Sequence, residues 1–190
     1  CTGSRRGRAA SGGAFSVTNL NVSSLKDGPI EASAAVSDAA GNAAVPATRT
    51  IQLDKTAPTV SISIDSITAD NVVNASEDDS TSTINVTGEV GGDVKVGDTV
   101  TLTLTTAGSA NTSYTGTVSL SGSNKIFSIA VKGDKLASDA DTTISASVTT
   151  TDAAGNSTTG TATKAYTLDS AAPTISIDAV ATDNIINASE

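Results

Sequence analysis

Residues 54–77 read DKTAPTVSISIDSITADNVVNASE, and residues 169–190 read DSAAPTISIDAVATDNIINASE. The two segments align with Pro58 on Pro173, which gives the chain an internal period of 115 residues at this point. Alternating apolar and polar residues follow each proline, and alternation with a period of two is typical of a β-strand with one buried face. The repeating unit is therefore predicted to begin with a strand.

A second repeated string gives the period elsewhere in the chain. The pentapeptide DAAGN occurs at 38–42 and again at 152–156, a period of 114 residues. The opening strand has two extra residues in its first copy, since TVSISID at 59–65 corresponds to TISID at 174–178. A two-residue insertion leaves every later side chain on its original face of a strand, because side chains alternate with a period of two. The repeat is therefore expected to consist of strands.

The repeat divides the chain into four expected segments. Residues 1–13 are rich in Gly, Ser, Ala and Arg and resemble nothing downstream, so we expect them to be unstructured and not native to the repeat array. The C-terminal part of one repeat is expected at 14–54, a complete repeat at 55–168, and the first strand of a further repeat at 169–190. The neighbouring repeats of the same chain are thus the expected partners of each repeat.

Seven alternating runs in the complete repeat predict seven strands, separated by turn-rich stretches such as GEVGGD, SGSN and AAGN. Seven short strands in about 110 residues indicate an all-β fold, an immunoglobulin-like β-sandwich of two sheets. Aromatic residues make up only 2% of the chain, so its core must be built from Val, Ile, Leu and Ala. The predicted strands are 59–64, 83–88, 99–105, 113–120, 126–131, 142–150 and 160–168.

Composition excludes several classes of function. The net charge of −9 repels phosphate backbones, so no nucleic acid partner is expected. No apolar run approaches the roughly 18 residues that a bilayer-spanning helix needs, so no membrane insertion is expected. The chain has no histidine, which removes the usual general base and zinc ligand, and its only thiol is that of Cys1. We therefore predict that the chain is not an enzyme.

Four strings carry a resemblance to a known family: LDKTAPT, DNVVNASE, KVGDTVTLTL and TDAAGNS, in this order along the chain. Together they resemble the bacterial Ig-like repeats of large, biofilm-associated, type-I-secreted surface adhesins, and the resemblance covers nearly everything from residue 14 onward. It implies an extracellular stalk on the bacterial cell surface that extends a distal binding module. It also implies that a host or surface ligand is bound elsewhere in the full protein, and that calcium commonly stiffens the repeats.

Acidic and amide side chains are predicted to gather at the C-terminal pole, the end of the complete repeat where the chain leaves it. The loop after the first strand carries Asp70, Asn74 and Glu77, and the following linker carries Asp169. Calcium prefers six to eight oxygen ligands from carboxylates, amides and backbone carbonyls. These four residues are therefore candidate calcium ligands. A second loop expected at this pole carries further acids, which are Asp134, Asp139 and Asp141.

A second candidate set is predicted at the N-terminal pole, where the chain enters the repeat. There the linker residue Asp54 is expected to meet Asp152 and Asn156 of the last loop, and the preceding repeat contributes Asp27. Clustered carboxylates repel one another, and a divalent cation would relieve that repulsion. The alternative for both sets is that Asp and Asn are present as turn residues, which they favour by conformation.

The sequence favours a structural spacer over two other functions. One alternative is a ligand-binding module for a glycan or a protein, and the other is a sandwich linker in a secreted multidomain enzyme. Sugar-binding platforms generally need exposed aromatic rings, and this chain has only four aromatic residues. Three of the four fall at strand positions expected to lie inside or close to the core, and the four are Phe15, Tyr114, Phe127 and Tyr166.

Overall fold

The protein was analysed as a computed structural model that describes residues 18–178, 186 and 188. Its contacts divide the chain into two compact units, Cys1–Thr56 and Ala57–Glu190. The expectation for residues 1–13, and that for the end of the segment 169–190, lie outside the described residues.

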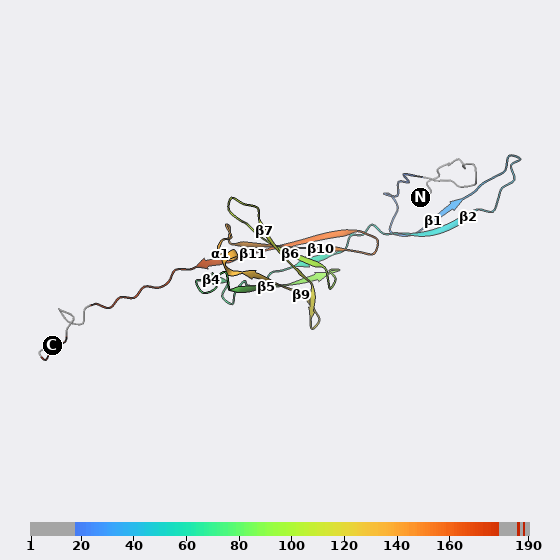
Figure 1. Cartoon of the computed structure of the whole chain (residues 1–190). Coiled ribbons are helices and arrows are strands. Elements are labelled where there is room, and N and C mark those ends of the chain that lie inside the picture. The colour runs from blue at the N-terminus through green and yellow to red at the C-terminus, as the bar shows by residue number, and fades with distance from the viewer. Residues whose placement is uncertain (1–17, 179–185, 187, 189–190) are drawn as a thin grey trace. The chain divides into compact units, whose positions relative to one another are not determined.

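The first unit contains an antiparallel pair of strands, β1 (Gly28–Ala34) and β2 (Ala47–Leu53) (Figure 1). Gly28 lies opposite Leu53 and Ala34 opposite Ala47, so the pairing extends over the whole of both strands. The DAAGN string at 38–42 lies in the connection between them, where the turn-forming residues Asp, Gly and Asn are expected.

The second unit contains two four-stranded antiparallel sheets, which confirms the predicted immunoglobulin-like β-sandwich (Figure 1). A short parallel pair of strands lies outside both sheets. The first sheet is formed, in spatial order, by β3 (Val60–Ile62), β5 (Thr83–Gly92), β9 (Asn124–Lys132) and β8 (Ser119–Ser121). The second is formed by β11 (Ser157–Ala165), β10 (Thr143–Thr151), β6 (Thr99–Leu104) and β7 (Thr112–Thr117). The parallel pair is formed by β4 (Val72–Asn74) and β12 (Thr167–Asp169).

The core lies between the two sheets and is built mainly from aliphatic side chains. Along β10, the buried residues Ile144, Ala146 and Val148 alternate with less buried hydroxyl residues, as the period of two requires. Phe127 of β9 is completely buried and is the largest of the fully buried side chains. Each fully buried aliphatic or phenyl side chain contributes about 1.5–3 kcal/mol to stability, so the facing strands hold the sandwich together without a disulfide.

The predicted strand 113–120 is wrong as a single element. The chain forms β7 in one sheet, passes through the buried residue Val118, and continues as β8 in the other sheet. Because the chain changes sheets at this residue, the alternation of the run 113–120 is interrupted, and 61% of Leu120 is exposed. The sandwich therefore has eight strands in its two sheets, where the sequence predicted seven.

The predicted strand 83–88 is too short, because residues 88–92 of GEVGGD form the second half of β5 and only Asp93 lies in a turn. Its glycines are required by close packing. A Cβ atom at Gly88 would lie 2.0 Å from the carbonyl oxygen of Ser63 and 2.7 Å from the ring of Phe127. Glycine within a strand often marks such a close approach of another backbone, and here it admits the chain that follows β3.

The end of the predicted strand 160–168 is also wrong. β11 ends at Ala165, and residues 167–169 form β12, which pairs with β4, a strand that the sequence did not predict. The one helix among the described residues, α1 (Gly133–Ala137), was also not predicted. β4 and α1 lie at the same end of the unit, from which the C-terminal segment leaves (Figure 1). In the described part of the chain, no helix has the length and apolar character that crossing a membrane requires.

Candidate functional site: the loops at the two poles

The parallel pair β4–β12 brings the C-terminal linker to the loop that follows the first strand. Asp169 is the register partner of Asn74, and Leu168 is that of the fully buried Val73. The Oε2 atom of Glu77 accepts a hydrogen bond of 3.0 Å from the backbone N–H of Asn74. Three of the four residues predicted at this pole, Asn74, Glu77 and Asp169, therefore lie on adjoining backbone.

The fourth residue, Asp70, closes a turn of its own. Its Oδ1 atom accepts hydrogen bonds from the N–H of Val72 (3.0 Å) and the hydroxyl of Thr68 (2.9 Å). These two donors, the amide first, lower the pKa of the Asp70 carboxyl. Asn74 behaves in the same way, because its Oδ1 atom accepts from the N–H (3.0 Å) and the hydroxyl (2.7 Å) of Ser76. Both side chains make contacts typical of turn residues.

Asn71 connects this loop to the end of β11, a role that the sequence analysis missed. Its Nδ2 atom donates to the carbonyl oxygen of Ala165 (2.9 Å), and its own carbonyl oxygen accepts from the N–H of Thr167 (3.1 Å). Its backbone has a φ of 63°, in the left-handed region that asparagine tolerates better than most residues. The Asp-Asn dipeptide in the sequence was the available signal for such a turn.

Asp139 lies in the second loop expected at this pole, but its carboxylate is buried and hydrogen-bonded within the unit. Only 5% of it is exposed. Its Oδ1 atom accepts from the N–H of Thr105 (2.8 Å), and its Oδ2 atom accepts from the N–H of Thr143 (3.1 Å) and the hydroxyl of Tyr166 (3.0 Å). Burial raises the pKa of Asp139, in spite of these donors, and burial beside this carboxylate also raises the pKa of Tyr166.

At the N-terminal pole, Asp152 and Asn156 are hydrogen-bonded to each other within one turn. The Oδ1 atom of Asp152 accepts from the N–H groups of Ala154 and Asn156, both at 2.9 Å, and Oδ2 accepts from Nδ2 of Asn156 (2.8 Å). The side chain of Asn156 and the backbone amides lower the pKa of Asp152. These contacts are what the turn alternative predicts.

The same turn occurs in the first unit. Asp38 accepts from the N–H (2.8 Å) and the Nδ2 atom (2.7 Å) of Asn42 in the same arrangement, and its pKa is lowered by the same groups. The linker residue Asp54 accepts from the N–H of Thr56 (3.0 Å) and belongs to the first unit. Since Asp152 belongs to the second unit, a meeting of Asp54 with Asp152 and Asn156 stays a prediction.

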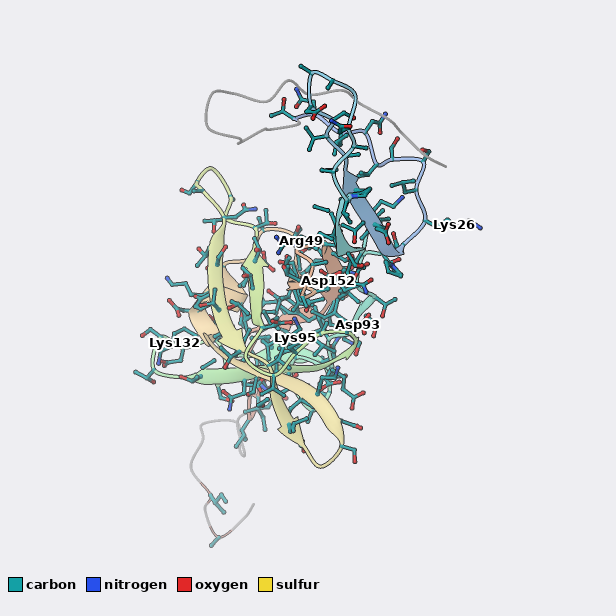
Figure 2. The ribbon with its side chains drawn as sticks, turned by 90° about the vertical axis from the view of Figure 1, so that its right-hand side faces the viewer. Lys26, Arg49, Asp93, Lys95, Lys132 and Asp152 are labelled. Atoms are coloured by element: carbon teal, nitrogen blue, oxygen red, sulfur yellow. The ribbon has the colours of Figure 1, made fainter. Side chains whose placement is uncertain are left out.

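Two further residues of the N-terminal pole were missed by the sequence analysis. Asp93 accepts from the N–H and the hydroxyl of Thr59, both at 2.8 Å, so it holds the start of β3. The ammonium group of Lys95 donates to the carbonyl oxygen of Thr151, next to Asp152. Figure 2 shows Asp93, Lys95 and Asp152 in one region of the second unit. Asp93 is the last residue of GEVGGD, and the interpretation of that stretch as a turn gave no indication that Asp93 binds Thr59.

The candidate residues fit calcium in donor type, because Asn74, Glu77 and Asp169 offer carboxylate and amide oxygens, which this hard cation prefers. Within the described ranges, however, no group of three or more His, Cys, Asp or Glu side chains is close enough to hold a metal ion. Most of the carboxylates and amides described above already accept hydrogen bonds from their own loops. A metal at either pole would therefore need oxygens from more than one loop or repeat.

Two facing four-stranded antiparallel sheets with these loops define the second unit as an immunoglobulin-like β-sandwich module. A 1.5-MDa bacterial ice-binding adhesin that is retained at the host cell surface is 39% identical over 88% of this chain, with a TM-score of 0.58. A Ca²⁺-stabilised adhesin that helps an Antarctic bacterium reach out and bind ice is 38% identical over 86% of this chain, with a TM-score of 0.63. This chain spans 50% and 37% of the lengths of those two structures.

A bacterial immunoglobulin-like domain from the M. primoryensis ice-binding adhesin is 42% identical over 60% of this chain and 99% of its own length, with a TM-score of 0.48. No protein-family model matches the sequence, and no curated protein sequence matches it. On the identity and coverage of the two ice-binding adhesins with TM-scores of 0.58 and 0.63, the chain belongs to the bacterial immunoglobulin-like repeats of large adhesins.

Proposed function

We propose that this chain is a stalk segment of a bacterial cell-surface adhesin, whose repeats hold a distal binding module away from the cell. The observation that carries the proposal is the repeated turn, since Asp38 with Asn42 and Asp152 with Asn156 form the same hydrogen bonds in successive units. A stalk needs identical modules joined by short linkers, and each module contacts mainly its neighbours. In such a protein the surface ligand is bound by another part of the chain, and the repeats are extracellular.

We further propose that calcium stiffens the junctions between repeats. At the C-terminal pole Asn74, Glu77 and Asp169 would hold the ion, with Asp70 beside them, and at the N-terminal pole Asp54, Asp152 and Asn156 would do so. The ion would neutralise carboxylates that otherwise repel one another across a junction. One of the similar adhesins is itself stabilised by Ca²⁺, and the oxygen donors at the C-terminal pole support the same chemistry here.

The test compares the full chain with Asp54→Ala and with a control, Glu31→Ala, which removes an exposed acid from β1. Melting temperature and small-angle X-ray scattering are followed from EDTA to millimolar calcium. A ligand that binds only the folded state stabilises it by about 2.7 kcal/mol at 100 times its dissociation constant. We expect calcium to raise the melting temperature of the unaltered chain and of Glu31→Ala, and to narrow the range of molecular dimensions that scattering detects. Both effects should be smaller in Asp54→Ala. If the unaltered chain does not respond to calcium, the calcium proposal is wrong and the repeats act as spacers without a metal ion.

A further inference from the structure

The linker between the two units is fastened to the first unit by Lys55 and Thr56. The ammonium group of Lys55 donates hydrogen bonds to the carbonyl oxygens of Ser23 (3.2 Å) and Leu25. The hydroxyl of Thr56 donates to Oδ2 of Asp27 (2.6 Å). The Thr56 hydroxyl is the first cause of a lowered pKa of Asp27, and the positive charge of Lys55 lowers it further. The loop that carries these three acceptors precedes β1.

The linker is fastened to the second unit two residues later. Pro58 is buried, and Thr59 donates through both its N–H and its hydroxyl to Oδ2 of Asp93, each at 2.8 Å. Between Thr56 and Pro58 only Ala57 remains. A residue that precedes proline is restricted to extended backbone, so even Ala57 has a narrow range of conformations.

We propose that Lys55 and Thr56 form a latch that fixes the linker to the first unit without a metal ion and confines bending to Ala57. The ammonium group of Lys55 binds two loop carbonyl oxygens, as a bound cation would, but it is covalently attached and always present. The inference deepens the stalk function proposed above, because it names the residues that limit bending at this junction.

A second lysine of this chain binds loop carbonyls in the same way. The ammonium group of Lys125 donates to the carbonyl oxygens of Gly92 (2.8 Å) and Val94 (2.6 Å) at the end of β5. A lysine that bridges two carbonyl oxygens is therefore a recurring device in this protein.

The second copy of the linker lacks the latch. Ser170 and Ala171 stand where Lys55 and Thr56 stand in the first copy, so neither the ammonium group nor the hydroxyl donor is present. The turn itself is kept, because Asp169 accepts from the N–H of Ala171 (3.1 Å) as Asp54 does from Thr56. The two junctions thus share a turn but differ in the contacts that hold it to the preceding repeat.

The test uses the full chain in EDTA and the double variant Lys55→Ser/Thr56→Ala, which gives the first linker the residues of the second. The control is Lys26→Ser, which removes one positive charge from the same loop. Figure 2 shows the side chain of Lys26 extending away from the ribbon. We expect the double variant to raise the pKa of Asp27 toward its ordinary value, measured by NMR titration of its carboxyl carbon. We also expect hydrogen exchange at the amide of residue 56 to accelerate roughly two- to tenfold.

Bending is measured separately by pulsed electron paramagnetic resonance. Spin labels are attached at Ser33→Cys in β1 and Thr161→Cys in β11, both exposed positions, in a background with Cys1→Ser. We expect the distance distribution between the labels to broaden in the double variant but not in Lys26→Ser. An unchanged Asp27 titration together with an unchanged distribution would overturn the latch and leave the calcium test unaffected. If the distance distribution broadens in the double variant and the unaltered chain does not respond to calcium, the latch is supported and the calcium proposal is wrong.

Discussion

Replacing Asp139 by alanine is expected to destabilise the second unit by about 1–2 kcal/mol. The estimate follows from the donors that lose their acceptor. The N–H of Thr105 loses its 2.8 Å bond to the buried carboxylate. The other two donors keep a partner, because Thr143 also donates to Asp141 (3.2 Å) and Tyr166 also donates to the carbonyl oxygen of Leu136 (2.7 Å). Relief of a buried charge offsets part of the loss, since burial already disfavours the ionised form of Asp139.

The assay is urea denaturation at neutral pH, followed by far-ultraviolet circular dichroism. A domain of this size has a total stability of about 5–15 kcal/mol, so the expected loss shifts the midpoint clearly while leaving the slope unchanged. The matched control is Asp141→Ala, two positions along the same loop, whose exposed carboxylate accepts from the hydroxyl of Thr105 (3.0 Å). Its removal is expected to cost less than about 1 kcal/mol. If Asp139→Ala shifts the midpoint no further than Asp141→Ala, the buried carboxylate does not have the role assigned to it.

Three further outcomes are expected. Tyr166→Phe should lower the free energy of unfolding by about 1–1.5 kcal/mol in the same urea assay, because a buried hydroxyl donor to Leu136 and Asp139 is lost. Gly133→Ala should lower the free energy of unfolding and accelerate amide hydrogen exchange in α1, since the added Cβ atom would lie 1.6 Å from the carbonyl oxygen of Glu77. NMR titration should give Asp139 a pKa above and Asp152 a pKa below the ordinary value. The raised pKa of Asp139 gives a contribution to stability that is present below the ordinary pKa and is lost as the pH rises through the folded-state pKa. The lowered pKa of Asp152 gives a contribution that is present above the ordinary pKa and is lost as the pH falls through the folded-state pKa.

Strand alternation predicted the central strands well but not the places where packing overrides it. The predicted run 99–105 is one residue longer than β6 at its C-terminal end, and the predicted run 142–150 is offset from β10 by one residue. The prediction failed at Gly88, where a neighbouring backbone excludes a side chain, and at Val118, where the chain changes sheets. Neither event leaves a periodic signal, because both depend on residues distant in the sequence.

The candidate site was predictable in position more than in detail. The sequence placed Asp169 beside the loop of Asn74 from topology alone, and the register of β12 with β4 agrees. It did not separate Asp139, which is buried, from Asp141, which is exposed. The two acids lie two positions apart in one loop, and Asp139 differs in its hydrogen bond to the buried Tyr166, which lies between β11 and β12, 27 positions further on.

The pairing of β12 with β4 determines how the repeat responds to tension. A pull on the two ends of the unit acts through Thr59, at the start of β3, and through Asp169, at the end of β12. A pull directed along the axes of these two strands loads the hydrogen bonds to their partner strands in shear, so that the hydrogen bonds share the load. Bonds loaded together in shear must rupture together, whereas bonds opened from one end rupture singly. Under flow, the rate at which the repeat lengthens is then its forced unfolding rate, and three paired residues next to the linker help to set it.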